Sequence, residues 1–244
     1  RFHDNSLRIK AYDITRINFR EWLNVVRTYD LLIFLHSTNS NATALNRMHI
    51  YSLLFRKGKT VFFIGNEYKL IPEKIMLLKK TKADYVVSQL PQNIAEWLYS
   101  GICKNIISVP HALNIEVFQP VNKFHDRKID VGSRSAEYPW YLGDTDRNKA
   151  IDFMRSLEKN GFAVNVSSDM SKRFERADWA NFLSNCKFTV ATEAGTSFLE
   201  KDDKTRKAVN KFVNENTDKT FEDVFEVFFK NYKNPVSGKC ISPR

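Results

Sequence analysis

Val109-Pro110-His111-Ala112-Leu113-Asn114-Ile115-Glu116-Val117-Phe118-Gln119-Pro120 is the stretch that divides this chain of 244 residues. It follows an apolar, strand-like run, has a proline near each end, and leads into a polar segment, 121–127, with few core-forming residues. A connector bounded by prolines is typical of a border between domains. We therefore expect an N-terminal domain over residues 1–118 and a C-terminal domain over residues 119–244.

On both sides of this connector, short apolar runs alternate with amphipathic helical stretches. The predicted strands are 31–35, 60–64, 85–87 and 106–107 before it, and 128–131, 162–166 and 187–191 after it. This alternation predicts the α/β class: two Rossmann-like domains, each with a mainly parallel sheet covered by helices on both faces. Ligands bind such sheets at the carboxyl ends of the strands, so the two domains are expected to face a cleft that holds the active site.

Local signals fix some of the helices and turns. Ala44, Met48, Tyr51 and Phe55 lie at helical spacing and predict one buried stripe. Gly132-Ser133-Arg134 is expected to be a turn at the end of a strand. The sequence begins without Met and stops after a strand-like approach, so we expect native sequence to continue and the second domain to be incomplete.

The composition limits the class of protein. The apolar runs are far shorter than the roughly 20 residues needed to cross a bilayer. Three widely spaced cysteines show no metal-site spacing and favour a reducing cytosol over a disulfide framework. The net charge of +10 suits an anionic substrate or an acidic membrane surface, although solvated helix faces explain it equally well. Aromatic residues do not alternate with the basic ones, which argues against nucleic acid.

No compact catalytic motif is present, but polar groups stand where predicted strands end. Gly132-Ser133-Arg134 offers backbone amides, a hydroxyl and a guanidinium, which suits a diphosphate, or it is simply a turn. Glu193 could bind sugar hydroxyls or act as a base, or it caps a following helix. His36 and His111 are each more often packed side chains than catalysts.

Three stretches of the chain resemble a known family. Residues 109–114 with Phe118 and Pro120 are similar to the linker of GT-B glycosyltransferases of the bacterial, family 4-like type (glycosyl transferases group 1). Residues 179–203 look like a strand and loop of a bacterial subgroup, and the ending Ile241-Ser242-Pro243-Arg244 resembles the lead into the donor-binding helix. The carboxylate pair of that family would lie just beyond Arg244.

The resemblance implies a metal-independent hexosyltransferase without a cofactor, whose substrate is a nucleotide-sugar donor, UDP- or GDP-linked. In that interpretation His36, Glu67 and Glu193 are the candidate catalytic residues, with His36 and Glu67 facing the acceptor. The donor would be held by Gly132, Ser133, Arg134, Gly195, Ser242 and Arg244.

The expected acceptor is a glycan or a lipid-linked sugar of bacterial surface polysaccharide or glycolipid synthesis. The enzyme would then be cytoplasmic, with peripheral contact to the anionic inner face of the plasma membrane. Two other interpretations stay open. One is a nucleotide-sugar epimerase of the same fold, and the other is a non-catalytic α/β binding module.

Overall fold

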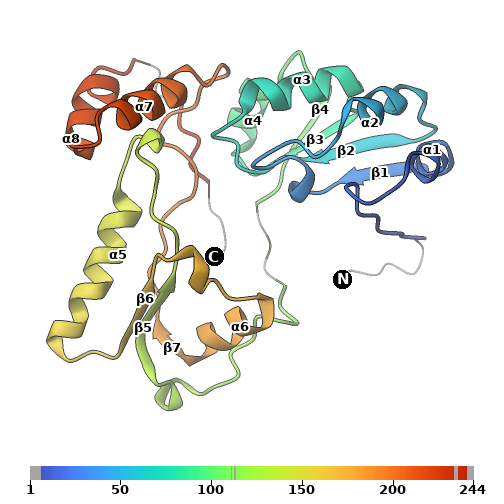
Figure 1. Ribbon diagram of the computed structural model, residues 1–244. Coiled ribbons are helices and arrows are strands. Elements are labelled where there is room, and N and C mark those ends of the chain that lie inside the picture. The colour runs from blue at the N-terminus through green and yellow to red at the C-terminus, as the bar shows by residue number, and fades with distance from the viewer. Residues whose placement is uncertain (1–6, 111, 113, 234–235, 241–244) are drawn as a thin grey trace. The chain divides into compact units, whose positions relative to one another are not determined.

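The computed structural model describes residues 7–110, 112, 114–233 and 236–240, and the chain forms two compact units (Figure 1). Unit 1 is Arg1–Val109 and unit 2 is Pro110–Arg244. The units therefore meet at the first proline of the connector, whereas we expected the border after Phe118. His111 lies outside the described residues.

Unit 1 is built on a four-stranded parallel sheet with the order β1-β2-β3-β4. Its strands are β1 (Leu31–Phe34), β2 (Lys59–Phe63), β3 (Tyr85–Ser88) and β4 (Asn105–Ser108), and its helices are α1 (Phe19–Thr28), α2 (Arg47–Ser52), α3 (Ile71–Thr81) and α4 (Gln92–Tyr99). The four strands predicted for this half of the sequence are thus confirmed, with shifts of at most one residue at their ends.

Within the described residues of unit 1, helices cover one face of this sheet, so the prediction of helices on both faces was wrong. Right-handed crossovers between strands that pair in sequential order put their helices on one face, and Figure 1 shows α2 and α3 on the same side of the strands. Leu32 and Phe34 of β1 point to the covered face and are buried, whereas Leu31, Ile33 and the following Leu35 are each about half exposed.

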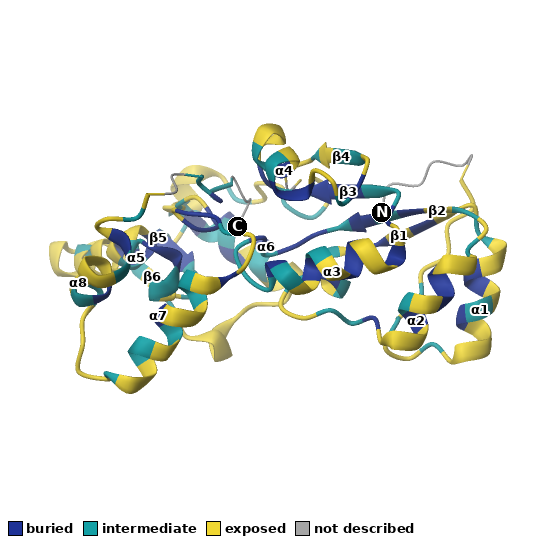
Figure 2. Cartoon of the chain, turned by 90° about the horizontal axis from the view of Figure 1, so that it is seen from above, coloured by how far each residue is buried: buried dark blue, intermediate teal, exposed yellow. Residues whose placement is uncertain are grey.

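The covered face holds the core of unit 1, and Figure 2 shows its buried residues along β2 and α3. Trp22 of α1 lies edge-on to Phe34, which stacks on Phe62 with ring centroids 4.4 Å apart. Trp22 also meets His49 of α2 and donates a hydrogen bond of 2.6 Å to the Ser52 hydroxyl.

The predicted buried stripe of α2 is wrong. Met48, Tyr51 and Phe55 are more than half exposed, and His49, Ser52 and Leu53 are buried instead. The helix begins only at Arg47, after Asn39 and Thr43 have formed a local bridge, so Ala44 lies outside it. Its rotation is set by the contact of His49 with Trp22, which helical periodicity alone does not reveal.

Unit 2 has a three-stranded parallel sheet with the order β6-β5-β7. The strands are β5 (Ile129–Arg134), β6 (Val164–Ser167) and β7 (Cys186–Phe188), and the helices are α5 (Asp146–Ser156), α6 (Arg176–Asn185), α7 (Lys204–Glu215) and α8 (Phe221–Val224), which continues as a π-helical turn, Phe225–Phe229. Gly132-Ser133-Arg134 therefore belongs to the central strand and is not a turn. β7 ends at Phe188, so residues 189–191 lie after the strand.

The C-terminal helices of unit 2 form their own apolar cluster. Phe198, Val209, Val224 and Phe229 are its buried members. The Thr220 hydroxyl accepts the Asp223 N–H and the Asp223 carboxylate accepts the Thr220 N–H, which is a capping box at the start of α8. None of the helices in the described residues has the length and apolar character needed to span a membrane.

Asp84 ties the first residues of β2 to the segment that enters β3. Its carboxylate lies 2.8 Å from the Arg56 Nη2 and 2.9 Å from the Lys59 Nζ, and it accepts the Thr60 N–H at 3.0 Å. Burial on its own would raise the pKa of Asp84, but the hydrogen bonds from Lys59, Arg56 and Thr60 outweigh it and lower the pKa to about 2.

We predict that Asp84→Asn lowers the free energy of unfolding at pH 7 by about 2 kcal/mol. Because the folded pKa lies below the unfolded one, this stabilisation is complete above about pH 4 and is lost as the pH falls towards 2. Urea unfolding of both proteins between pH 2 and 7 measures it. Asp30→Asn is the control, because Asp30 pairs with Lys57 through a carboxylate that is 87% exposed. Equal losses for the two variants would contradict the assignment.

Candidate functional site

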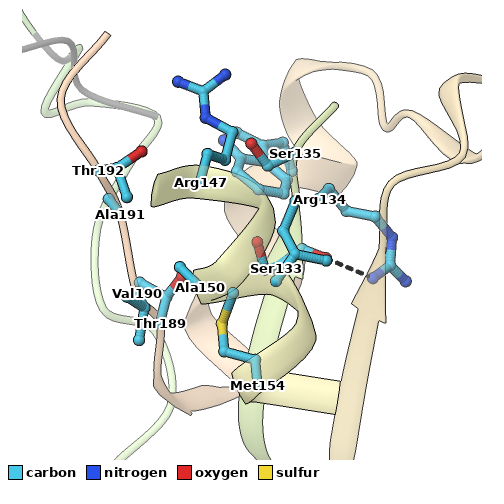
Figure 3. Close-up of a pocket in the computed structure, with 12 residues that line it drawn as sticks. Ser133, Arg134, Ser135, Arg147, Ala150, Met154, Thr189, Val190, Ala191 and Thr192 are labelled. Atoms are coloured by element: carbon cyan, nitrogen blue, oxygen red, sulfur yellow. Dashed lines mark hydrogen bonds between the residues drawn. The ribbon is translucent and has the colours of Figure 1, made fainter. Parts of the chain in front are cut away.

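A small pocket opens in unit 2 at the carboxyl ends of β5 and β7 (Figure 3). Its wall combines the end of β5 with Ser135, the first turns of α5, Trp179 of α6 and the segment 189–192 that follows β7. Its volume is about 30 Å³, which is room for about two water molecules. A larger ligand would place one small group inside and the rest over the rim.

The lining of this pocket is positively charged. It contains two arginines, Arg134 and Arg147, and no acidic side chain, together with the hydroxyls of Ser133, Ser135 and Thr192. Arginine and hydroxyl groups recognise phosphate-like anions through charge-assisted hydrogen bonds. The pocket also holds no histidine, cysteine or lysine that could take a proton from a substrate. Its chemistry is that of an anion-binding site.

Arg147 is the buried cation of the site, with 7% of its surface exposed. It lies in the first turn of α5, 3.6 Å above the centre of the Tyr138 ring, and its Nη2 donates to the Tyr138 hydroxyl at 2.7 Å. That hydroxyl donates in turn to the backbone carbonyl of Glu193. Tyr138 therefore links α5 to the segment after β7, and these are two walls of the pocket.

Arg134 is turned out of the pocket. Its guanidinium donates to the backbone and side-chain oxygens of Asn165 on β6, at 2.9 and 2.6 Å, and lies over the rings of Phe174 and Phe182. In Figure 3 its side chain extends away from Arg147. Burial lowers the pKa of Arg134. The predicted diphosphate contact would require this side chain to leave the two rings.

Two polar atoms of the lining are buried without a hydrogen-bond partner. They are the Thr192 Oγ1 and the Arg134 Nε. Buried polar groups are almost always paired with protein, water or ligand. The Arg134 side chain extends away from the pocket, so the Thr192 hydroxyl is the unpaired group of the lining that a bound oxyanion could contact.

Gly132 and Gly195 are explained by close packing. A Cβ on Gly132 would lie 2.2 Å from the Cys186 Sγ and 2.8 Å from the Phe182 Cζ. Gly195 has a φ of +94°, and a Cβ there would lie 2.0 Å from the Gly238 carbonyl oxygen. Glycine is thus required at both positions whether or not a donor binds. Ser133, between Gly132 and Arg134, is 5% exposed and lines the pocket.

Glu193 follows the pocket residue Thr192, and its side chain is exposed. It does not cap a helix, because no helix starts within the segment 189–203 that follows β7. The next residue, Ala194, pairs with Cys240 through two backbone hydrogen bonds of 2.9 Å, so the C-terminal described segment lies against this loop. Ser242 and Arg244 lie outside the described residues.

Glu67 does not face a substrate. It is 5% exposed, and its carboxylate accepts hydrogen bonds from the Ser88 hydroxyl, the Gln89 N–H and the Tyr99 hydroxyl, at 2.7, 2.9 and 2.7 Å. Burial raises the pKa of Glu67, while these donors and Lys74 act in the opposite direction. The predicted acceptor-side role is therefore corrected: this carboxyl anchors the loop after β2 to β3 and α4.

Lys74 supports the same loop from α3. Its side chain is fully buried, and the ammonium donates to the backbone carbonyls of Gly65, Asn66 and Lys69 at 2.7–2.9 Å.

Of the predicted catalytic residues in unit 1, only His36 is partly exposed. It lies in a 3₁₀ turn after β1 with its ring edge-on to Phe63. Sheet topology thus brings Glu67 and His36 to the carboxyl side of the sheet, but of these two only His36 reaches the surface.

Sequence reasoning missed Arg147, Tyr138 and Thr192. In the sequence, Arg147 is one of many basic residues at helical spacing, and Tyr138 is one of several aromatic residues in the segment 138–141. The available signal was position: an arginine in the first turn of the helix that follows the first strand of a parallel sheet lies at the carboxyl edge of that sheet. Thr192 carried no signal beyond following a strand.

Comparison of the chain with models of known families, with curated proteins and with solved structures finds no match. Within the described part of the chain, no group of three or more His, Cys, Asp or Glu side chains could hold a metal ion. A functional assignment therefore depends on the chemistry of the pocket in unit 2.

We predict that Gly132→Ala destabilises the protein by about 1–3 kcal/mol, because the added methyl overlaps Cys186 and Phe182. Urea unfolding measures the change. Adding Cys186→Ala removes the nearer atom and should recover part of the loss. Alanine keeps the backbone N–H, so the substitution tests packing and not the amide. An unchanged stability would mean that β5 and β7 do not approach as closely as described.

We also predict that Tyr138→Phe lowers the free energy of unfolding by about 1–3 kcal/mol, since it removes the hydrogen bonds of the Tyr138 hydroxyl with the buried Arg147 and with the Glu193 carbonyl. Tyr141→Phe is the matched control in the same segment. In the described residues the Tyr141 hydroxyl makes no hydrogen bond, and we expect a change below about 0.5 kcal/mol. Thermal and urea unfolding distinguish the two, and similar effects would argue against the bridge.

Proposed function

We propose that this chain is a glycosyltransferase of the GT-B kind and that unit 2 binds the diphosphate of a UDP- or GDP-sugar at the pocket beside β5 and β7. The observation that carries the proposal is the presence of a buried guanidinium, Arg147, and an unpaired buried hydroxyl, Thr192, in one pocket at the carboxyl edge of a parallel sheet. In open α/β sheets that edge is where phosphate-bearing ligands bind.

The role of Arg147 in this proposal follows from its surroundings. A fixed guanidinium stabilises charge that develops on a leaving diphosphate, and it costs little reorganisation when it is already held in place. The Tyr138 ring and hydroxyl provide that support. Arg134 would contribute only after leaving Phe174 and Phe182. The hydroxyls of Ser133 and Thr192 supply further contacts to phosphate oxygens.

Fewer residues of unit 1 remain as candidates for the acceptor side than the sequence indicated. Glu67 is committed to the interior of unit 1, so His36 remains as the candidate base from that unit. Glu193 is exposed beside the pocket and suits contacts with sugar hydroxyls. The net charge of +10 is compatible with a glycan or lipid-linked acceptor at an anionic cytoplasmic membrane face, which is part of the same proposal.

A second function, binding of a phosphate-bearing ligand without chemistry, is favoured by one observation. The pocket lining has no side chain that can take up a proton near neutral pH. A non-catalytic module would need only the anion contacts described above.

The binding test uses pyrophosphate, UDP and GDP with the unaltered chain and with Thr192→Val. In the free protein the Thr192 Oγ1 is buried without a partner, so valine should leave the stability unchanged or raise it. If the hydroxyl contacts an anion, the same change should weaken pyrophosphate binding roughly three- to tenfold. Isothermal titration calorimetry measures the affinity, and Thr217→Val, on the surface after α7, is the control.

The activity test incubates the protein with UDP- and GDP-sugars, with and without glycan acceptors, and identifies products by mass spectrometry. A glycosylated acceptor supports the transferase, a free epimer supports the epimerase, and binding without turnover supports the module. Failure of pyrophosphate and both nucleotides to bind would overturn the proposed site itself.

A further inference from the structure

A second pocket lies in unit 1, between the segment that enters α1 and the start of α2. Its volume is about 310 Å³, which is within the range of sites for small molecules. Its lining combines five apolar side chains with three polar ones, its exposed wall is about as polar as it is apolar, and it contains no lysine, arginine or carboxylate: Ile14, Thr15, Ile17, Phe19, Ala44, Asn46, Met48 and His49.

His49 is the buried polar group of this pocket, with 7% of its surface exposed. Its Nδ1 accepts the backbone N–H of Asn46 at 3.4 Å, while the Asn46 side chain accepts the His49 N–H at 2.9 Å. An accepting Nδ1 carries no proton, so the neutral ring has its proton on Nε2. Burial lowers the pKa of His49 and thereby favours this neutral form.

The Nε2–H of His49 is a donor for which the described residues supply no acceptor. The ring of Trp22 packs edge-on to the imidazole at a centroid distance of 5.2 Å and fixes its orientation. Nε2 is also absent from the buried atoms that lack a partner, so the residual exposure of the residue includes this atom. A fixed, neutral N–H at the wall of a pocket of mixed polarity recognises an oxygen acceptor.

We propose that this pocket binds a compact, uncharged molecule with an apolar part, whose carbonyl oxygen accepts a hydrogen bond from the His49 Nε2–H. The absence of lysine and arginine from the lining disfavours a phosphate or carboxylate ligand. Ile14, Ile17, Phe19 and Met48 provide apolar contact for the rest of the molecule. The site lies wholly in unit 1 and is independent of the anion pocket in unit 2.

The test compares cyclohexanone with methylcyclohexane, which has the same number of heavy atoms and no acceptor. Nuclear magnetic resonance titration follows the Met48 methyl group and the side-chain nitrogens of His49 in the full chain. We expect saturable binding of the ketone with a Kd of roughly 1–10 mM. The hydrocarbon should bind roughly two- to tenfold more weakly, because it leaves Nε2–H unpaired.

Two variants locate the ligand. His49→Asn keeps an acceptor for the Asn46 N–H but removes Nε2, and should reduce the affinity for the ketone to that for the hydrocarbon. Met48→Glu keeps His49 and places a charge on the pocket wall, which should abolish binding of both probes. Its control is Met76→Glu on α3, because Met76 is 53% exposed and Met48 is 54% exposed.

Several outcomes would overturn the proposal. They are an absence of saturable shifts at Met48 and His49 for the unaltered chain, equal affinities for ketone and hydrocarbon, or unchanged ketone binding in Met48→Glu. If His49→Asn unfolds, the comparison of the two methionine variants still decides whether this pocket is the site.

Discussion

Parallel pairing of strands is the constraint on which both units depend. Each strand must be followed by a crossover before the chain can pair again in the same direction, so the loops after successive strands gather at one edge of the sheet. In unit 2 this brings residues 133–135, the start of α5 and residues 189–192 around one pocket. The same rule places the loop after β2, which contains Glu67, at the corresponding edge of unit 1.

The order of the strands then decides what is buried. In unit 1 the strands pair sequentially, so the crossover helices share a face, and the core contains Trp22, Phe34 and Phe62. Two titratable side chains of this interior, Glu67 and Lys74, are each surrounded by hydrogen-bond partners. Glu67 is matched by three donors, and Lys74 by three carbonyls, which is the condition under which buried charged or titratable groups are tolerated.

In unit 2 the packing depends on two glycines at which neighbouring segments come too close for a side chain. Gly132 allows β7 and α6 to pack against the central strand, and Gly195 allows the segment at Gly238 to cross the loop after β7. The pocket is what remains between these contacts and α5. Its walls are held by the Tyr138 bridge between Arg147 and the Glu193 carbonyl. Gly132 and Gly195, which the sequence assigned to donor binding, therefore shape the pocket without lining it.

The sequence by itself determined the α/β class, the seven strands found in the described residues, and the proline-bounded connector, because apolar periodicity and proline geometry are local properties. It predicted a turn at Gly132-Ser133-Arg134, whereas these residues are the last three of β5. Only the tertiary structure decided that Glu67 is an interior anchor, that Met48 is exposed while His49 is buried, and that Arg147 and Thr192 meet at one pocket. Those facts depend on which face each helix turns to the sheet and on contacts between residues far apart in the chain, and a local pattern carries no information about either.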